Sequence, residues 1–211
     1  MSLRYPRLCT ILTSLTMTCV LGAQSSSSSS KHASKPATGL IDDGRVSNGT
    51  YHNPAFGFSC NIPSGWVLRT QEMNAPEDPV IGAGAEGRAL LAAFSRPPEA
   101  RGEDINASIV IAAESVATYP GLMDAAQYFG PLIEVVKARG FKVAEEPYGF
   151  AIGPKSLARA DFQKDVGTHV MRQATLVYLA RGYALSFTFI AGSEEDVDEL
   201  IEGLKFGVVT K

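Results

Sequence analysis

The stretch NPAFGFSCNIPSGW, residues 53–66, carries the clearest structural pattern of this chain of 211 residues. Its apolar side chains alternate with small or polar ones, and this period of two predicts a half-buried β-strand. The side chains predicted to face the core are Phe56, Phe58, Cys60 and Ile62. Pro63 and Gly65 predict a turn, because proline fixes its own φ and glycine accepts a positive one. Trp66, the only tryptophan, is then expected to begin the return strand and to close the turn.

Cys60 admits two interpretations, a catalytic nucleophile or a core residue. A nucleophilic cysteine needs a lowered pKa and a nearby histidine. Cys60 lies between Phe58 and Ile62 on the same strand face, so the pattern favours an inert core position. These residues therefore predict a structural signature, with no catalytic residue in it.

Residues 1–23 resemble a secretory signal peptide: Arg4 and Arg7 precede an apolar run that ends at Ala23. An uncleaved membrane anchor is the alternative, although the apolar run is shorter than the ~20 residues that a spanning helix needs. Lipid attachment through Cys19 is disfavoured, because Thr16 and Thr18 occupy positions where a lipid-attachment motif has leucine and a small residue. We expect a mature chain without a transmembrane helix and an extracytoplasmic location, periplasmic or secreted.

After the signal peptide, the composition predicts a Ser-rich linker at 24–47 and one domain at 48–211. Removal of Arg4 and Arg7 makes the formal net charge of −3 more negative. The acidic balance argues against nucleic acid as a partner, since nucleic-acid binding depends on basic patches. Cys60 would then be the only cysteine, so no disulfide can form within the domain.

The domain pattern combines several strands with two helices. Apolar residues at three- and four-residue steps predict a helix over 122–139, kinked or split at Gly130-Pro131 and capped by Gly140. A hairpin is expected over 169–192, and a helix capped by Ser193 follows it. Consecutive hairpins with one helix in the middle and one at the end predict an α+β fold, an antiparallel β-sheet flanked by helices.

The segment YHNPAFGFSCNIPSGW at 51–66 resembles the opening hairpin of the Mog1/PsbP-like family. The hairpin LVYLARGYALSFTFIA and the acidic helix ending in GLKF are similar to the end of that family's domain, so the resemblance covers roughly residues 50 to 208. The resemblance implies an α/β/α sandwich around an antiparallel sheet, in a bacterial exported protein. It also implies mostly non-catalytic binding or assembly functions, and no ligand set carries over to this chain.

Other candidate motifs have ordinary explanations. The glycines of GAGAEG, 82–87, match a dinucleotide fingerprint in spacing, but no strand precedes them and a strand-like segment follows, so a hairpin loop is expected. His169, with Asp161 and Asp165 near it in sequence, could act in a hydrolase with a hydroxyl such as that of Ser186. An exposed histidine at a strand end is the simpler interpretation, and we expect no metal site and no cofactor. The acidic clusters around Asp104 and Asp196 are interpreted as solvated surface and helix capping.

Aromatic residues offer one further hypothesis, a groove between helix and sheet. Its candidate lining residues are Tyr119, Tyr128, Tyr148 and His169. Together these features predict a non-catalytic exported module that engages a protein partner or a small ligand at the cell envelope. A hydrolase built on His169 and a structural envelope protein are the alternatives.

Overall fold

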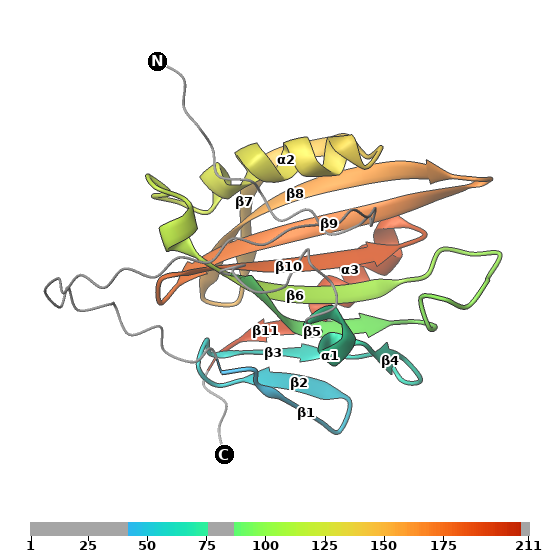
Figure 1. The fold of residues 1–211 in the computed structure, drawn as a ribbon, viewed down its shortest axis with the longest axis horizontal. Helices are drawn as coiled ribbons and strands as arrows, with labels where there is room; N and C mark the ends of the chain where they lie inside the picture. Colours follow the sequence, from blue (N-terminus) through green and yellow to red (C-terminus); the bar gives the residue numbers. More distant parts are fainter. Residues whose placement is uncertain (1–41, 76–86, 208–211) are drawn as a thin grey trace, which may run out of the picture.

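The computed structural model describes residues 42–75 and 87–207. The predicted signal peptide at 1–23, most of the linker and residues 82–86 of the glycine motif lie outside the described residues. Figure 1 shows the fold. The elements in chain order are β1 (Arg45–Ser47), β2 (Thr50–Asn53), β3 (Phe58–Asn61), β4 (Val67–Leu68), α1 (Thr70–Met73), β5 (Gly87–Phe94), β6 (Ser108–Ser115), η1 (Val116–Thr118), η2 (Ala126–Tyr128), α2 (Phe129–Ala138), β7 (Lys142–Ile152), β8 (Lys155–Val166), β9 (His169–Ala180), β10 (Tyr183–Ala191), α3 (Glu194–Glu202) and β11 (Leu204–Phe206).

A large antiparallel sheet forms the centre of the domain, with the strand order β4-β5-β6-β10-β9-β8-β7. The chain leaves the sheet after β6, passes through η1, η2 and α2, and returns as the meander β7 to β10. The last strand of this meander, β10, closes the sheet by pairing with β6. The predicted hairpin over 169–192 is confirmed as β9 and β10, joined by Arg181 and Gly182, which both have positive φ.

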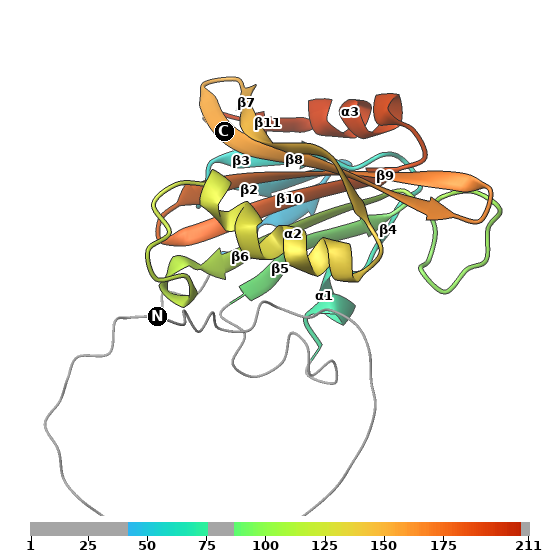
Figure 2. The same ribbon diagram turned by 90° about the horizontal axis from the view of Figure 1, so that it is seen from above.

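Helices cover both faces of this sheet, with α2 on one face and α3 on the other (Figure 2). Neighbouring residues of one strand therefore enter different cores. On β9, Leu176 packs in the cluster that contains α3, while Val177 packs in the cluster that contains α2. The predicted α+β class, with an antiparallel sheet flanked by helices, is confirmed. Among the described residues no helix is long and apolar enough to cross a membrane.

A second, smaller sheet lies on the same face as α3 and was not predicted. Its strand order is β1-β2-β3-β11. The strand predicted over 56–62 is present only over Phe58–Asn61, as β3, and its partners are β2 and β11. Phe56 and Gly57 lie in the turn before it, because Gly57 has a φ of 71° and donates its N–H to Asn53 O. The expected return strand after Trp66 is wrong, because β4 joins the large sheet and pairs with β5. The turn at 63–65 thus carries the chain from one sheet to the other.

The small sheet also begins earlier than the predicted domain boundary. Arg45–Ser47, at the end of the range predicted as linker, form β1 and pair with β2. β1 can pair with β2 because Asn48 and Gly49 form a tight hairpin turn between them, with φ values of 50° and 72°.

The predicted helix over 122–139 is shorter than expected. The 3-10 turn η2 leads directly into α2, which begins at Phe129, so Pro131 lies in the first turn of the helix. An N–H group there has no partner within the helix, and a proline at this point removes no helical hydrogen bond. Gly140 follows the helix with a φ of 83° and donates its N–H to Lys137 O, as its predicted capping role requires.

Phe58 is the residue through which the small sheet packs on the large one. Its side chain is completely buried and its ring meets that of Phe187 edge-on, with 5.0 Å between the centroids. We expect Phe58→Ala to lower the free energy of unfolding by about 3–5 kcal/mol, because the removed ring leaves a cavity between the sheets. Urea denaturation followed by circular dichroism measures this change. Val46→Ala, at a strand residue that is 42% exposed, is the control and should change stability by less than about 0.5 kcal/mol. Equal effects of the two substitutions would contradict this assignment of the core.

Candidate functional site

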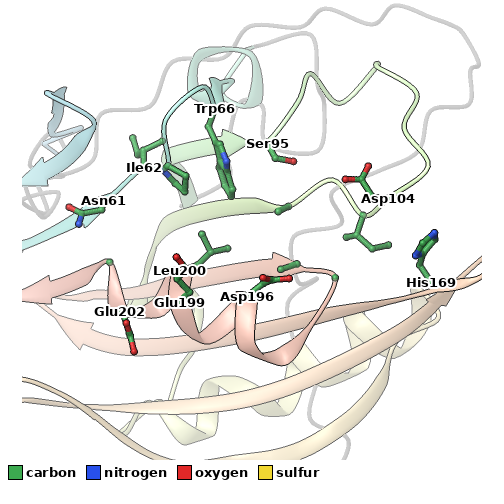
Figure 3. A pocket seen from close by; sticks show the side chains of 16 residues that line it. Asn61, Ile62, Trp66, Ser95, Asp104, His169, Asp196, Glu199, Leu200 and Glu202 are labelled. Carbon is green, nitrogen blue, oxygen red and sulfur yellow. The ribbon is translucent and has the colours of Figure 1, made fainter.

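The main candidate site is a groove between the turn at 63–65 and helix α3, which we call the Trp66 groove (Figure 3). Its volume is about 780 Å³. The segments that form it lie far apart in the sequence, in the β3–β4 connection, the loop after β5, the start of β9 and helix α3. Its lining residues are Asn61, Ile62, Pro63, Trp66, Ser95, Asp104, Ile105, Ala107, His169, Ala191, Gly192, Asp196, Glu199, Leu200, Glu202 and Gly203.

The position of Trp66 follows from the change of sheet. The N–H of Ile62 donates to Gly49 O at 2.7 Å, which holds the end of β3 in the small sheet. Gly65 has a φ of 83°, and the N–H of Trp66 donates to Pro63 O at 3.3 Å, which closes the turn. The indole therefore stands at the seam between the sheets, where it is half-buried and packs against the core while also lining the groove.

The groove has an acidic rim. Four of its lining side chains are carboxylates, and no Lys or Arg is among the described residues that line it. Asp104 is compensated by Arg96, whose Nη1 lies 2.6 Å from Asp104 Oδ1. In the described ranges, Asp196, Glu199 and Glu202 make no ion pair. An apolar floor with uncompensated negative charge beside it suits a ligand that is cationic and partly apolar.

His169 is exposed at the start of β9 and lines this rim. Figure 3 shows it at the same end of the groove as Asp104. Within the described part of the chain its side chain makes no hydrogen bond or ion pair. The hydroxyl of Ser95, which also lines the groove, donates to Asn106 Oδ1 at 2.9 Å. A catalytic base must be oriented and within hydrogen-bond reach of the proton that it takes. No described group orients His169 in this way. The described residues also contain no group of three or more His, Cys, Asp or Glu side chains placed to hold a metal ion.

The other three residues of the hypothetical aromatic groove lie elsewhere. Tyr119 and Tyr128 contact each other on the α2 face, with 5.4 Å between their ring centroids, and Tyr119 donates a hydrogen bond to Glu114. Burial, followed by the charge of Glu114, raises the pKa of Tyr128 well above its ordinary value. This pair belongs to the core under α2, and it does not meet His169 in one groove.

Tyr148 lies on β7, in a smaller cavity of about 420 Å³ on the other side of α3. Its hydroxyl donates to Asp161 Oδ2 at 3.1 Å, and burial followed by the Asp161 charge raises its pKa. Arg159 forms ion pairs of 2.9 Å with both Asp161 and Asp198 in this cavity. Arg159 is thus paired with both carboxylates within the protein, whereas Glu145, which also lines this cavity, makes no ion pair with the described residues.

The signature residues of 53–66 divide between core and groove. Phe58 and Cys60 are completely buried, whereas Phe56 packs against the same core with part of its surface exposed. Pro63 and Gly65 are exposed in the turn, and Pro63 lines the groove next to Trp66.

Burial also decides the chemistry of Cys60. Removal of the side chain from water raises the pKa of its thiol to about 12, so the thiolate is scarcely populated near neutral pH. The thiol donates a weak hydrogen bond to Asn61 O at 3.7 Å. A nucleophile would need the opposite, a lowered pKa and access to substrate.

Sequence patterns missed most of the groove. In the sequence, Asp104 and Asp196 stand out only as members of acidic clusters, and no pattern indicates that Glu199 and Leu200 line a groove. The one signal in the sequence is a tryptophan directly after the turn Pro63-Ser64-Gly65, since a residue that follows a turn can face a cleft.

Tyr51 and Cys60 face each other across β2 and β3, and burial raises the pKa of both to about 12. Because the pKa of each group is higher in the folded state, its neutral form stabilises the fold. This stabilisation is complete below the unfolded-state pKa values, which are near 9 for Cys60 and 10 for Tyr51. It is lost as the pH rises from these values toward 12. We expect the free energy of unfolding to fall above pH 9, on the order of 1 kcal/mol per pH unit for each group.

Urea denaturation at a series of pH values tests this expectation. The double variant Tyr51→Phe, Cys60→Ala removes both titrating groups and should show a shallower decline between pH 9 and 11, even if its stability at pH 7 is lower. If the free energy of unfolding declines equally with pH in the wild type and the double variant, Tyr51 and Cys60 do not cause the decline.

Comparisons with known proteins give structural matches only. No family model matches the chain, and no curated protein matches it. The solved PsbP protein (CyanoP) of Synechocystis sp. PCC 6803 is similar to it, with 15% identity, 75% of this chain and 91% of that chain covered, and a TM-score of 0.48. The Ran-binding protein Mog1p of Saccharomyces cerevisiae is 8% identical, with 74% of this chain and 94% of that chain covered and a TM-score of 0.43.

A protein of Bacteroides thetaiotaomicron is 14% identical over 77% of this chain, with a TM-score of 0.38, and the chain spans only 50% of its length. None of these likenesses assigns an activity, because one fold hosts many functions. Structures of both a PsbP and a Mog1 protein are among those that this chain resembles.

Proposed function

We propose that the chain is a non-catalytic binding module that holds a segment of a partner protein in the Trp66 groove, outside the cytoplasm. The observation that carries this proposal is the position of Trp66, half-buried beside a groove of about 780 Å³. Tryptophan is enriched among the residues that dominate binding energy at protein interfaces, because its large ring buries much apolar surface at little entropic cost.

The shape of the site supports a polypeptide ligand. The groove follows α3 from Asp196 to Gly203, which suits an extended segment. Its apolar side chains, among them Ile62, Trp66 and Leu200, adjoin exposed carboxylates. An apolar centre with a polar rim is the usual anatomy of a protein interface.

The chemistry of the described residues supports a role in binding over one in catalysis. Cys60 is a buried thiol with a raised pKa, and no described group orients His169. A covalent mechanism needs a nucleophile and a base within hydrogen-bond reach of each other. The support for export is the sequence of residues 1–23, with two arginines before an apolar run.

Site-specific crosslinking in cells that produce the full chain tests the proposal. A photoreactive amino acid replaces Asn61 or Pro63, which are exposed in the groove, and in a control it replaces Met123, which is 82% exposed on a segment that does not line the groove. We expect one discrete protein adduct from the groove positions and none from the control. The adduct should lie in an extracytoplasmic fraction and contain a chain that begins at Gln24.

Substitution of Trp66 by alanine should weaken that adduct at least about tenfold, since a central aromatic anchor is worth more than about 1.4 kcal/mol. Adducts of equal yield from Met123 and from the groove, or adducts that do not depend on Trp66, would refute the groove as the site. An adduct chain that retains residues 1–23 would refute the export step alone.

A further inference from the structure

The carboxylates of helix α3 differ in whether they have an ion-pair partner. On the side of the smaller cavity, Glu194 pairs with Arg172 at 3.1 Å and Asp198 pairs with Arg159 at 2.9 Å. On the side of the Trp66 groove, Asp196, Glu199 and Glu202 line the rim, and none of them has an ion-pair partner in residues 42–75 or 87–207. The paired carboxylates of α3 thus lie beside the smaller cavity, and Asp196 and Glu199 line the Trp66 groove without a partner. Glu202, at the end of the helix, lines both this groove and a third cavity that Arg159 and Lys205 also line.

This uncompensated row is unfavourable for the helix itself. Its members are spaced at i, i+3 and i+6, and like charges three residues apart repel each other. Glu199 and Glu202 also lie in the last turn, near the negative end of the helix dipole, and this turn holds no basic residue. Only Asp196, in the first turn, lies where the dipole favours a carboxylate. A cation seated between these side chains would relieve the repulsion.

The apolar part of the groove adjoins the same row. Figure 3 shows Trp66 and Leu200 extending toward each other from the turn and from α3, with Asp196 and Glu199 beside them. Lys and Arg have long apolar stems that can lie along such a surface while the charged head reaches a carboxylate. The face of an indole ring also attracts a cation directly.

We infer that the occupant of the Trp66 groove is a basic segment of a partner polypeptide, in which an Arg or Lys stem lies against Trp66 and its head reaches Asp196 and Glu199. This inference rests on the proposed function and names the partner chemistry of that same site. Asp196 and Glu202 are six residues apart on the helix, about 9 Å along its axis. In an extended segment, residues two or three apart are separated by about 7–10 Å. A second basic residue two or three positions along the segment therefore reaches Glu202.

Trp66 is the only tryptophan of the chain, so its fluorescence reports on this groove alone. The probe is the peptide acetyl-Gly-Ser-Arg-Leu-Arg-Ser-Gly-amide, added to the protein at low salt. We expect a saturable change in the emission of Trp66, and an apparent affinity that falls at least about threefold when salt rises from about 50 mM to about 300 mM. The same peptide with glutamate or glutamine in place of arginine should leave the emission unchanged.

Variants of α3 separate the effect on binding from an effect on folding. Glu199→Gln should weaken peptide binding at least about fivefold and, by removing a repulsive charge from the last turn, should raise the urea midpoint slightly. A loss of binding in a protein of equal or higher stability cannot result from unfolding. Glu134→Gln, at an exposed acidic residue of α2 on the opposite face of the large sheet, is the matched control and should bind as the wild type does.

Two outcomes would overturn the inference: no change in Trp66 emission with the arginine peptide, or an equal change with the glutamate peptide. An equal response to spermidine would also overturn it, because the site would then accept any polyamine. If these tests fail while Trp66-dependent crosslinks from Asn61 and Pro63 persist, the partner chemistry is wrong and the proposed function stands.

Discussion

The packing of Phe58 between the two sheets is the contact on which the rest of the structure depends. Phe58 meets Phe187 of the large sheet edge-on at 5.0 Å, and Phe206 of β11 lies 5.9 Å from each of them. The three rings join the first strands of the domain to the last one and to the centre of the large sheet. Because all three are buried, this hydrophobic contact joins the two ends of the domain, and Cys60, the one cysteine among the described residues, is free.

The Trp66 groove is a consequence of this closure. Since β3 is held in the small sheet by Phe58 and β4 belongs to the large one, the chain between them must cross the seam. The crossing takes only residues 62–66, and it leaves Trp66 between the turn and α3. Both sheets and α3 are thus needed to form the site, and a domain with the single sheet expected from the sequence would lack it.

Local patterns predicted the elements whose signals lie within one segment. The alternation over 56–62 predicts β3, the β-rich runs around Arg181 and Gly182 predict the β9–β10 hairpin, and Ser193 caps α3 by accepting the N–H of Asp196 at 3.1 Å. Pairing over a long range could not be predicted in this way. β11 has only three residues, too few for a periodic signal, yet it pairs with β3 from the other end of the domain.

The candidate site was harder to predict than the fold, because its residues come together only through the tertiary structure. Trp66 and Glu199 carry no common motif, and the charge of Glu199 is unusual only when its surroundings are known. Tyr119 and Tyr148 illustrate the converse: aromatic residues suggested one groove, but the sheet separates them, with the first beneath α2 and the second beside α3.

If Trp66 binds a ligand and adds little to the core, the Trp66→Ala variant should keep most of the stability of the protein. Its free energy of unfolding should be measured by circular dichroism in urea beside that of Phe187→Ala, a completely buried aromatic residue. We expect a loss of less than about 2 kcal/mol for Trp66→Ala and of about 3–5 kcal/mol for Phe187→Ala. Equal losses would contradict this expectation, because Trp66 would then be a core residue.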